Sequence, residues 1–85
     1  MEKVIIRGGQ EAELVFDDKN QRVMLKLGSV SHLITYIRDN QVKVKNDLLL
    51  NDADLTRVRT HSLDFADANG MIVGPADRLN PAEEA

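Results

Sequence analysis

The chain has 85 residues, of which 42% are hydrophobic, 4% aromatic and 29% charged, and its formal net charge is −3. This length and apolar fraction fit one globular domain with its own hydrophobic core. The absence of cysteine excludes disulfides, thiolate metal sites and a cysteine nucleophile, and the net negative charge argues against binding nucleic acid through bulk charge.

The two ends of the chain carry little apolar sequence. The run from Val4 to Ile6 is too short for a signal peptide or a membrane span. We therefore expect a cytoplasmic protein that does not enter a membrane. The polar composition of the C-terminal residues predicts one domain over residues 1–74 and a flexible tail over 75–85.

The first 27 residues predict a β-hairpin. Val4, Ile5 and Ile6 are β-branched, glycines follow at 8 and 9, and apolar side chains then alternate with polar ones over residues 11–16. This arm is either one strand with a glycine kink or two short strands. Residues 17–20 supply turn chemistry, and alternation resumes over 23–27.

The apolar period changes after Ser29, which favours a helix over residues 30–39. Ser29 is available as the N-cap, and Asn40 can end the helix in the left-handed conformation. The side chains that would form the apolar face recur at i, i+3, i+4 and i+7 and are Val30, Leu33, Ile34 and Ile37.

The second half predicts several short strands. Residues 42–45 alternate, residues 48–50 are all leucine, and residues 46–47 form a turn between them or a break. Residues 51–54 are either a turn or the start of a helix, and 55–62 fit a strand as well as a helix. Asn69 and Gly70 predict a hairpin between strands at 63–65 and 71–73.

A hairpin, one helix and several short strands form an α+β arrangement. With this order, the chain resembles the ubiquitin-related modifier family of β-grasp proteins. The resemblance is carried by residues 8–17 with 22–25, by the predicted helix at 33–38, and by the acidic stretch 51–54 with the Leu-Asp-Phe step at 63–65. It implies a β-grasp-like fold with a mostly antiparallel or mixed sheet.

Members of that family act as sulfur carriers or modifiers through a C-terminal Gly-Gly whose carboxylate is adenylated and thiolated. Here the sequence after Gly74 continues with Pro75 and ends Pro-Ala-Glu-Glu-Ala. The resemblance therefore implies the fold and an exposed sheet surface, and the missing diglycine disfavours the carrier alternative.

Our leading hypothesis is a small non-enzymatic protein-interaction module, an adaptor or regulator, that presents a sheet edge or face to a partner. An open sheet exposes backbone donors and acceptors at its edge, which a protein partner or a second copy of the chain can complete. We expect the partner contacts to come from interface-prone side chains of the predicted helix and from the predicted strands that follow it. These residues are Tyr36, Arg38, Val42, Val44, Leu48 and Leu50.

The alternative is a small nucleic-acid-binding regulator. Two pairs of cations at i, i+2, namely Lys43 with Lys45 and Arg57 with Arg59, would form one patch if both segments were neighbouring strands. No aromatic residue is interleaved for base stacking, and nearby aspartates make a solvated face the simpler interpretation.

No catalytic, metal or cofactor site is expected. His32 and His61 are the only imidazoles, and without cysteine they fall short of a zinc ligand set. Asp17 and Asp18 lie in a predicted turn, where exposed carboxyls with ordinary pKa values are useless for acid catalysis. There is no phosphate-binding loop or dinucleotide fingerprint.

Overall fold

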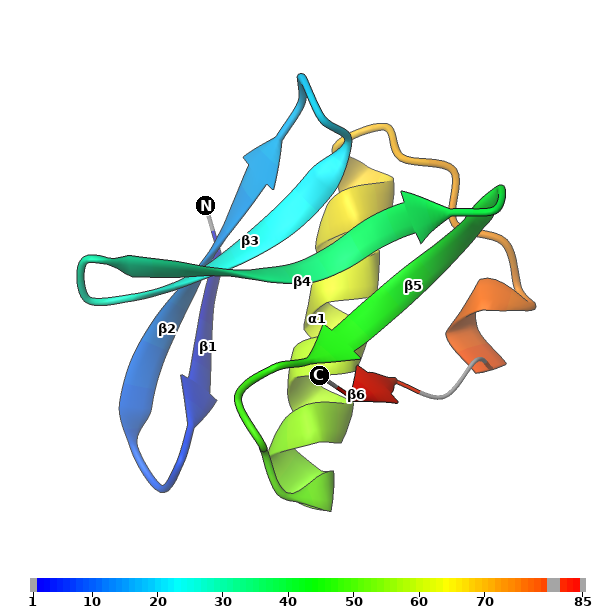
Figure 1. Cartoon of the computed structure of the whole chain (residues 1–85). Coiled ribbons are helices and arrows are strands. Elements are labelled where there is room, and N and C mark those ends of the chain that lie inside the picture. The colour runs from blue at the N-terminus through cyan, green and yellow to red at the C-terminus, as the bar shows by residue number, and fades with distance from the viewer. Residues whose placement is uncertain (1, 80–81, 85) are drawn as a thin grey trace.

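Five antiparallel strands followed by one helix make up the fold in the computed structural model, which describes residues 2–79 and 82–84. The strands follow one another in space as they do in sequence, and a short sixth strand adds in parallel next to the fifth. The sheet curls around the helix (Figure 1). The expected α+β class is confirmed. The elements are β1 (Glu2–Ile6), β2 (Gln10–Asp17), β3 (Arg22–Leu27), β4 (Val30–Arg38), β5 (Gln41–Asn46), α1 (Asp52–Ala68), the 3-10 turn η1 (Asp77–Leu79) and β6 (Glu83–Glu84).

The N-terminal hairpin expectation is confirmed, with the first arm divided into two strands. β1 pairs with β2, setting Val4 opposite Ala12, and β2 pairs with β3, setting Leu14 opposite Leu25. Because cross-strand partners share a face, the alternation read from the sequence places one apolar set toward the helix.

The predicted helix over residues 30–39 is wrong, because this segment is strand β4. The β3–β4 register sets Met24 opposite Leu33 and Val23 opposite Thr35, so Ile34 is an extra residue in a β-bulge. The extra residue interrupts the alternation of side chains along the strand. The apolar residues of β4 are therefore spaced three and four apart in the sequence, as they would be on a helix. The β-branched content of the segment agrees with the strand.

Tight turns at both ends of β4 explain the false helix signals. Gly28, with φ of 60°, and Ser29 form the two-residue loop between Leu27 and Val30. Asp39 and Asn40, with φ of 54° and 60°, form the next two-residue loop. Asn40 is left-handed as expected, but it closes a hairpin and does not end a helix.

The helix lies instead at α1, within the region whose state the sequence left open. The Asn51 side chain caps its first turn by accepting a hydrogen bond from the Asp54 amide at 2.8 Å. The helix ends where Met71 N donates to Ala66 O and Gly70 N to Asp67 O, with φ of 96° at Gly70. The predicted hairpin at 63–73 is therefore wrong, since the Asn-Gly pair terminates a helix.

Two further expectations differ from the structure. Residues 48–50 form no strand; they connect β5 to α1, with Leu48 and Leu50 buried and Leu49 83% exposed. The order hairpin, helix, strands, on which the β-grasp resemblance depended, is replaced by five strands and then the helix. The predicted strand at 42–45 is confirmed as β5.

The core lies between the concave face of the sheet and α1. Its members come from every long element: Val4, Ile6, Ala12, Leu14, Val23, Leu25, Ile34, Val42, Val44, Leu48, Leu50, Val58, Leu63, Ala66 and Met71. One polar contact crosses this layer, where the Thr35 hydroxyl donates to Ser62 Oγ at 2.8 Å. Ser62 Oγ in turn donates to Arg59 O, so both buried hydroxyls are satisfied.

The described part of the segment predicted as a tail packs against β5 and α1. Asp77 accepts hydrogen bonds from Val42 N at 3.2 Å and Gly74 N at 2.8 Å, and Arg59 donates to Arg78 O. β6 extends the sheet next to Lys45 and Asn46. In the described residues, no helix is long and apolar enough to cross a membrane.

Candidate functional site: the open face of the sheet

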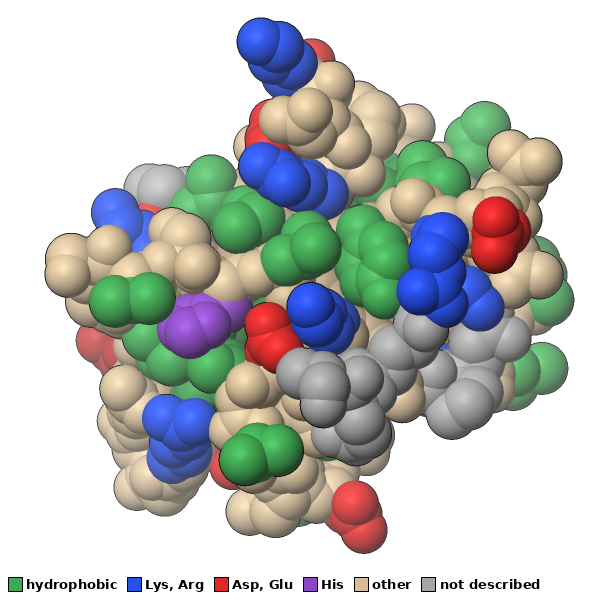
Figure 2. Space-filling view, viewed as in Figure 1, with side chains coloured by type: hydrophobic (Ala, Val, Ile, Leu, Met, Phe, Trp, Pro, Cys, Tyr) green, Lys and Arg blue, Asp and Glu red, His purple; other side chains and the backbone are tan. Residues whose placement is uncertain are grey.

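The convex face of the sheet points away from α1, and we call it the open face. In Figure 1 the helix lies behind β4 and β5, and Figure 2 shows the molecule from the same side. Strand alternation brings to this face several half-buried apolar side chains that do not pack against the core. We call these the apolar row: Val15, Met24, Leu33 and Tyr36.

The apolar row runs across three strands. Val15 on β2 faces Met24 on β3, and Met24 faces Leu33 on β4. Tyr36 lies beyond the bulge on the same strand as Leu33. Figure 2 shows hydrophobic side chains in green across the middle of this face over β4, with Lys and Arg side chains in blue on both sides. Aromatic and methionine side chains in such a setting are typical of interface centres.

Basic side chains surround Tyr36. Lys43 on β5 is its cross-strand partner, and Arg38 follows two residues later on the same side of β4. The antiparallel register that pairs Val23 with Thr35 brings Arg22 next to Tyr36 from the other side. The bulge therefore places one aromatic ring among cations from three strands.

The open face is basic although the whole protein is acidic. Strands β1–β5 direct six basic and three acidic side chains outward, a formal balance of +3, whereas the chain as a whole carries −3. The rest of the molecule is correspondingly acidic. The charged residues of the open face are Lys3, Glu11, Glu13, Asp17, Arg22, Lys26, Arg38, Lys43 and Lys45.

Among the described side chains, Arg22 and Lys45 each have a carboxylate close by, and these contacts are of the exposed kind that contributes little. Arg22 Nε lies 2.9 Å from Asp17 Oδ2, and Lys45 Nζ lies 3.6 Å from Asp47 Oδ2. No ion pair joins Lys43 to another of the described residues. Lys43, the cross-strand partner of Tyr36, thus keeps capacity for an external anion.

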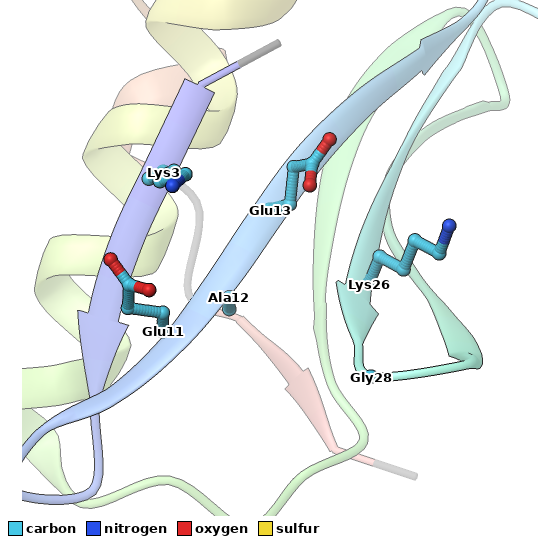
Figure 3. Close-up of a pocket in the computed structure, with 6 residues that line it drawn as sticks. All are labelled: Lys3, Glu11, Ala12, Glu13, Lys26 and Gly28. Carbon is cyan, nitrogen blue, oxygen red and sulfur yellow. The ribbon is translucent and has the colours of Figure 1, made fainter.

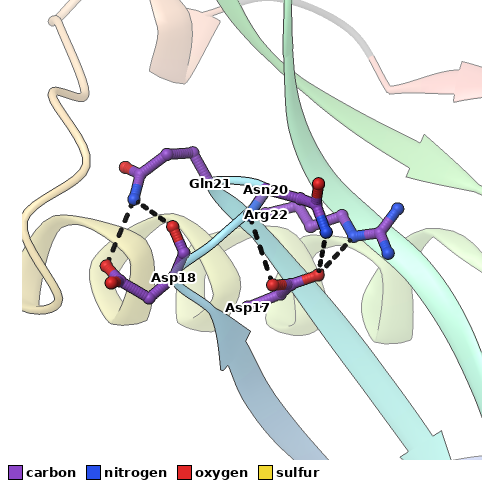
Figure 4. Close-up of polar contacts among 5 residues, drawn as sticks. All are labelled: Asp17, Asp18, Asn20, Gln21 and Arg22. Carbon is purple, nitrogen blue, oxygen red and sulfur yellow. Dashed lines mark hydrogen bonds and ion pairs between the residues drawn. The ribbon is translucent and has the colours of Figure 1, made fainter.

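The β2–β3 turn orients Arg22 (Figure 4). Asp17 accepts from Asn20 Nδ2 and from Arg22 Nε, both at 2.9 Å, while Gln21 Nε2 donates to Asp18 O at 2.7 Å. The hydrogen bonds from the Asn20 side chain, and next from Arg22, lower the pKa of Asp17. Its pKa was expected to be ordinary, and the downward shift moves it further from acid catalysis.

The other half of the open face is charge-balanced. Register sets Lys3, Glu13 and Lys26 in one row across β1, β2 and β3, as Figure 3 shows. With Glu11 and Gly28 they line a shallow depression of about 260 Å³. Alternating charges in such a row favour one strand register, and together with Glu11 the three charges sum to zero, which leaves no excess charge to attract a ligand.

A second hollow lies near the β4–β5 turn. It has a volume of about 380 Å³ and is lined in part by Ile37, which is 49% exposed, and Ile72, which is 89% exposed. Its remaining lining is mostly amide and backbone, so it offers an apolar shelf without a charged group to orient a ligand.

Both edges of the sheet are covered. Along β1, Arg57 of the helix donates to Ile5 O at 2.9 Å, and His61 Nδ1 lies 3.8 Å from the Glu2 carboxylate. Along β5, Asp77 accepts from Val42 N, and β6 pairs with the strand's end. A partner strand would have to displace these contacts, so the face is more accessible than either edge.

Burial separates the predicted partner contacts into two groups. Tyr36 and Arg38 lie on the open face. The other four are Val42, Val44, Leu48 and Leu50, which are 3–9% exposed and belong to the core. Their side chains cannot contact a partner, so the expectation for these four residues is wrong.

The two predicted cation pairs do not share a face. Lys43 and Lys45 lie on the open face, whereas Arg57 and Arg59 belong to α1. Residues two apart on a helix point in different directions. Arg57 donates to Ile5 O and Asp54, and Arg59 donates to Arg78 O. The four-cation patch behind the nucleic-acid alternative is therefore not formed.

The structure adds four residues that sequence reasoning missed: Val15, Met24, Leu33 and Arg22. Val15 and Met24 are apolar at positions where alternation should place polar side chains, which was an available signal. Leu33 was hidden by the bulge. Among the described residues, no cluster of histidine and carboxylate side chains could hold a metal ion.

No family model matches the chain, and no curated protein or solved structure is similar to it.

Proposed function

We propose that this protein is a small interaction module that binds a protein partner through the open face of its sheet. The observation that carries the proposal is the apolar row bordered by cations, on the face that no described element covers. Tyr, Met and Arg are enriched at interfaces, and an apolar centre with a charged rim is the usual arrangement.

Of the two modes expected from the sequence, the edge and the face of the sheet, we favour the face. Edge-strand pairing would have to remove Arg57 from Ile5 O, or Asp77 and β6 from β5. Binding to the open face requires no such rearrangement, and the half-buried side chains of the row would gain contacts. A face-binding adaptor or regulator is therefore the better-supported form of the hypothesis.

The test is affinity capture with tagged full-length protein from cells that express it natively. One variant combines Leu33→Ser with Tyr36→Ala on the open face. Its matched control combines Leu49→Ser with Ile72→Ser, which removes apolar side chains that are 83% and 89% exposed but lie elsewhere. Circular dichroism and Tm verify that both variants fold.

We expect the open-face variant to lose its partner, with recovery falling about tenfold or more, because truncating an interface centre costs roughly 2 kcal/mol or more. The control variant should retain the partner at the wild-type level. The proposal fails if the control loses the partner while the open-face variant keeps it.

A further inference from the structure

We infer that the partner contributes an acidic polypeptide segment whose carboxylates pair with the cations around Tyr36 and whose apolar side chain rests on the apolar row. This inference rests on the proposed function and specifies its partner.

The charge distribution over the open face indicates that the partner's segment is acidic. The cations of β3, β4 and β5 that border Tyr36 are Arg22, Arg38 and Lys43, with Lys45 further along β5. Among the described side chains of β2–β5, Asp17 is the carboxylate directed to that half of the face, and Asp47 lies beside Lys45 just after the end of β5. Guanidinium groups bind carboxylates with matched geometry, and a cationic surface on an otherwise acidic protein attracts anions to that place.

The difference in net charge between the two halves of the open face indicates where the acidic segment binds. Around Glu13, the two cations Lys3 and Lys26 are balanced by Glu13 and Glu11, so this half of the face has no excess charge that would attract an anion. The excess of positive charge is confined to the half over β3–β5. The carboxylates should therefore lie over that half, and Lys26 should contribute much less than Lys43.

The apolar row favours a polypeptide over a nucleic acid. Single-stranded nucleic acids bind through successive aromatic stacking platforms in a cationic groove. The open face has one aromatic residue, Tyr36, and its neighbours in the row are the aliphatic Leu33 and the thioether Met24. Aliphatic side chains match leucine-like partner residues, so an acidic segment with an embedded apolar residue fits the whole surface.

Titration of the ¹⁵N-labelled full chain with synthetic peptides tests the inference. Three peptides of equal length carry a central leucine and differ only in flanking residues, which are glutamate, glutamine or lysine. A fourth ligand is an oligothymidine of similar charge to the glutamate peptide. Amide shifts locate binding, and the titration gives Kd at low and high salt.

We expect the glutamate peptide alone to bind, with shifts at Arg22, Tyr36 and Lys43, and its affinity should fall as salt rises. Lys43→Glu should weaken it about five- to tenfold, close to 1–1.4 kcal/mol. The matched control Lys26→Glu makes the same change of charge on the balanced half of the face and should weaken it less than about twofold.

Equal loss in Lys26→Glu would show that net charge, and not the site around Tyr36, governs binding, and would overturn the inference. Tighter binding of oligothymidine would make the partner a nucleic acid. If no glutamate peptide binds at about 1 mM, acid recognition is wrong. In that case the capture experiment with the Leu33 and Tyr36 variant still decides whether the open face is the interface.

Discussion

The two faces of the sheet differ in what covers their apolar side chains. On β3, Leu25 is fully buried beneath α1, and its neighbour Met24 is half-buried on the open face. Both are large and apolar and they are adjacent in sequence, so their different environments come from strand alternation. Hydrophobicity alone does not tell which side chains build the core and which are available for a partner.

The covered face of the sheet forms the hydrophobic core together with α1. Its apolar side chains interdigitate with the helix, and the buried polar contact between Thr35 and Ser62 is fully satisfied. The open face combines partial burial with an excess of positive charge, which contributes little to a folded core. We therefore attribute stability mainly to the first face and propose recognition for the second.

Removal of core volume should give the largest effect on stability. Leu25→Ala should lower the free energy of unfolding by about 2–5 kcal/mol, since it leaves a cavity under α1. Met24→Ala, one residue away, should cost less than about 1 kcal/mol. Urea unfolding of both variants measures the difference, and equal losses would show that the open face is as tightly packed as the covered one.

Removal of the buried hydroxyl acceptor should have an intermediate effect. Ser62→Ala should cost about 1–3 kcal/mol, because it leaves the Thr35 hydroxyl buried without its partner. Thr35→Val should cost less, since Ser62 keeps its hydrogen bond to Arg59 O at 3.1 Å. Thermal unfolding of the two single variants and the double variant gives the coupling. A double variant as unstable as the sum of both would contradict a direct link between β4 and α1.

Acidification should produce the smallest effect, and it acts through the turn that orients Arg22. Because the folded pKa of Asp17 is lowered, this carboxylate contributes stability above its unfolded pKa of about 3.8, and that contribution disappears as pH falls through the folded value. Asp17→Asn should therefore reduce the dependence of Tm on pH below about 4. Asp18→Asn, in the same turn, is the control. An unchanged pH profile in Asp17→Asn would contradict the shift.

Sequence patterns predicted some elements correctly and others wrongly for identifiable reasons. Alternation over residues 11–16 and 23–27 was read correctly because the β2–β3 pairing has a regular register and the turn between the two strands is local. β4 was read as a helix because the bulge at Ile34 imitates helical spacing. Asn69 and Gly70 were read as a hairpin because positive φ serves hairpins and helix ends alike.

The candidate site was predicted only in part. Tyr36 and Arg38 were chosen for their residue types, and the structure places both on the open face. Lys43 and Lys45 were chosen as a pair on one side of a strand, and this is where they lie. Arg22 could not be linked to Tyr36, because their proximity depends on how β3 pairs with β4.

The sequence by itself determined the features that depend on neighbouring residues: the β2–β3 alternation and the turn at Asp17. Only the tertiary structure decided which face the helix covers, and that β4 bulges to place Tyr36 among cations from three strands. The physical reason is that strand pairing and bulges are stabilised by hydrogen bonds and packing between distant segments, and no local period records those partners.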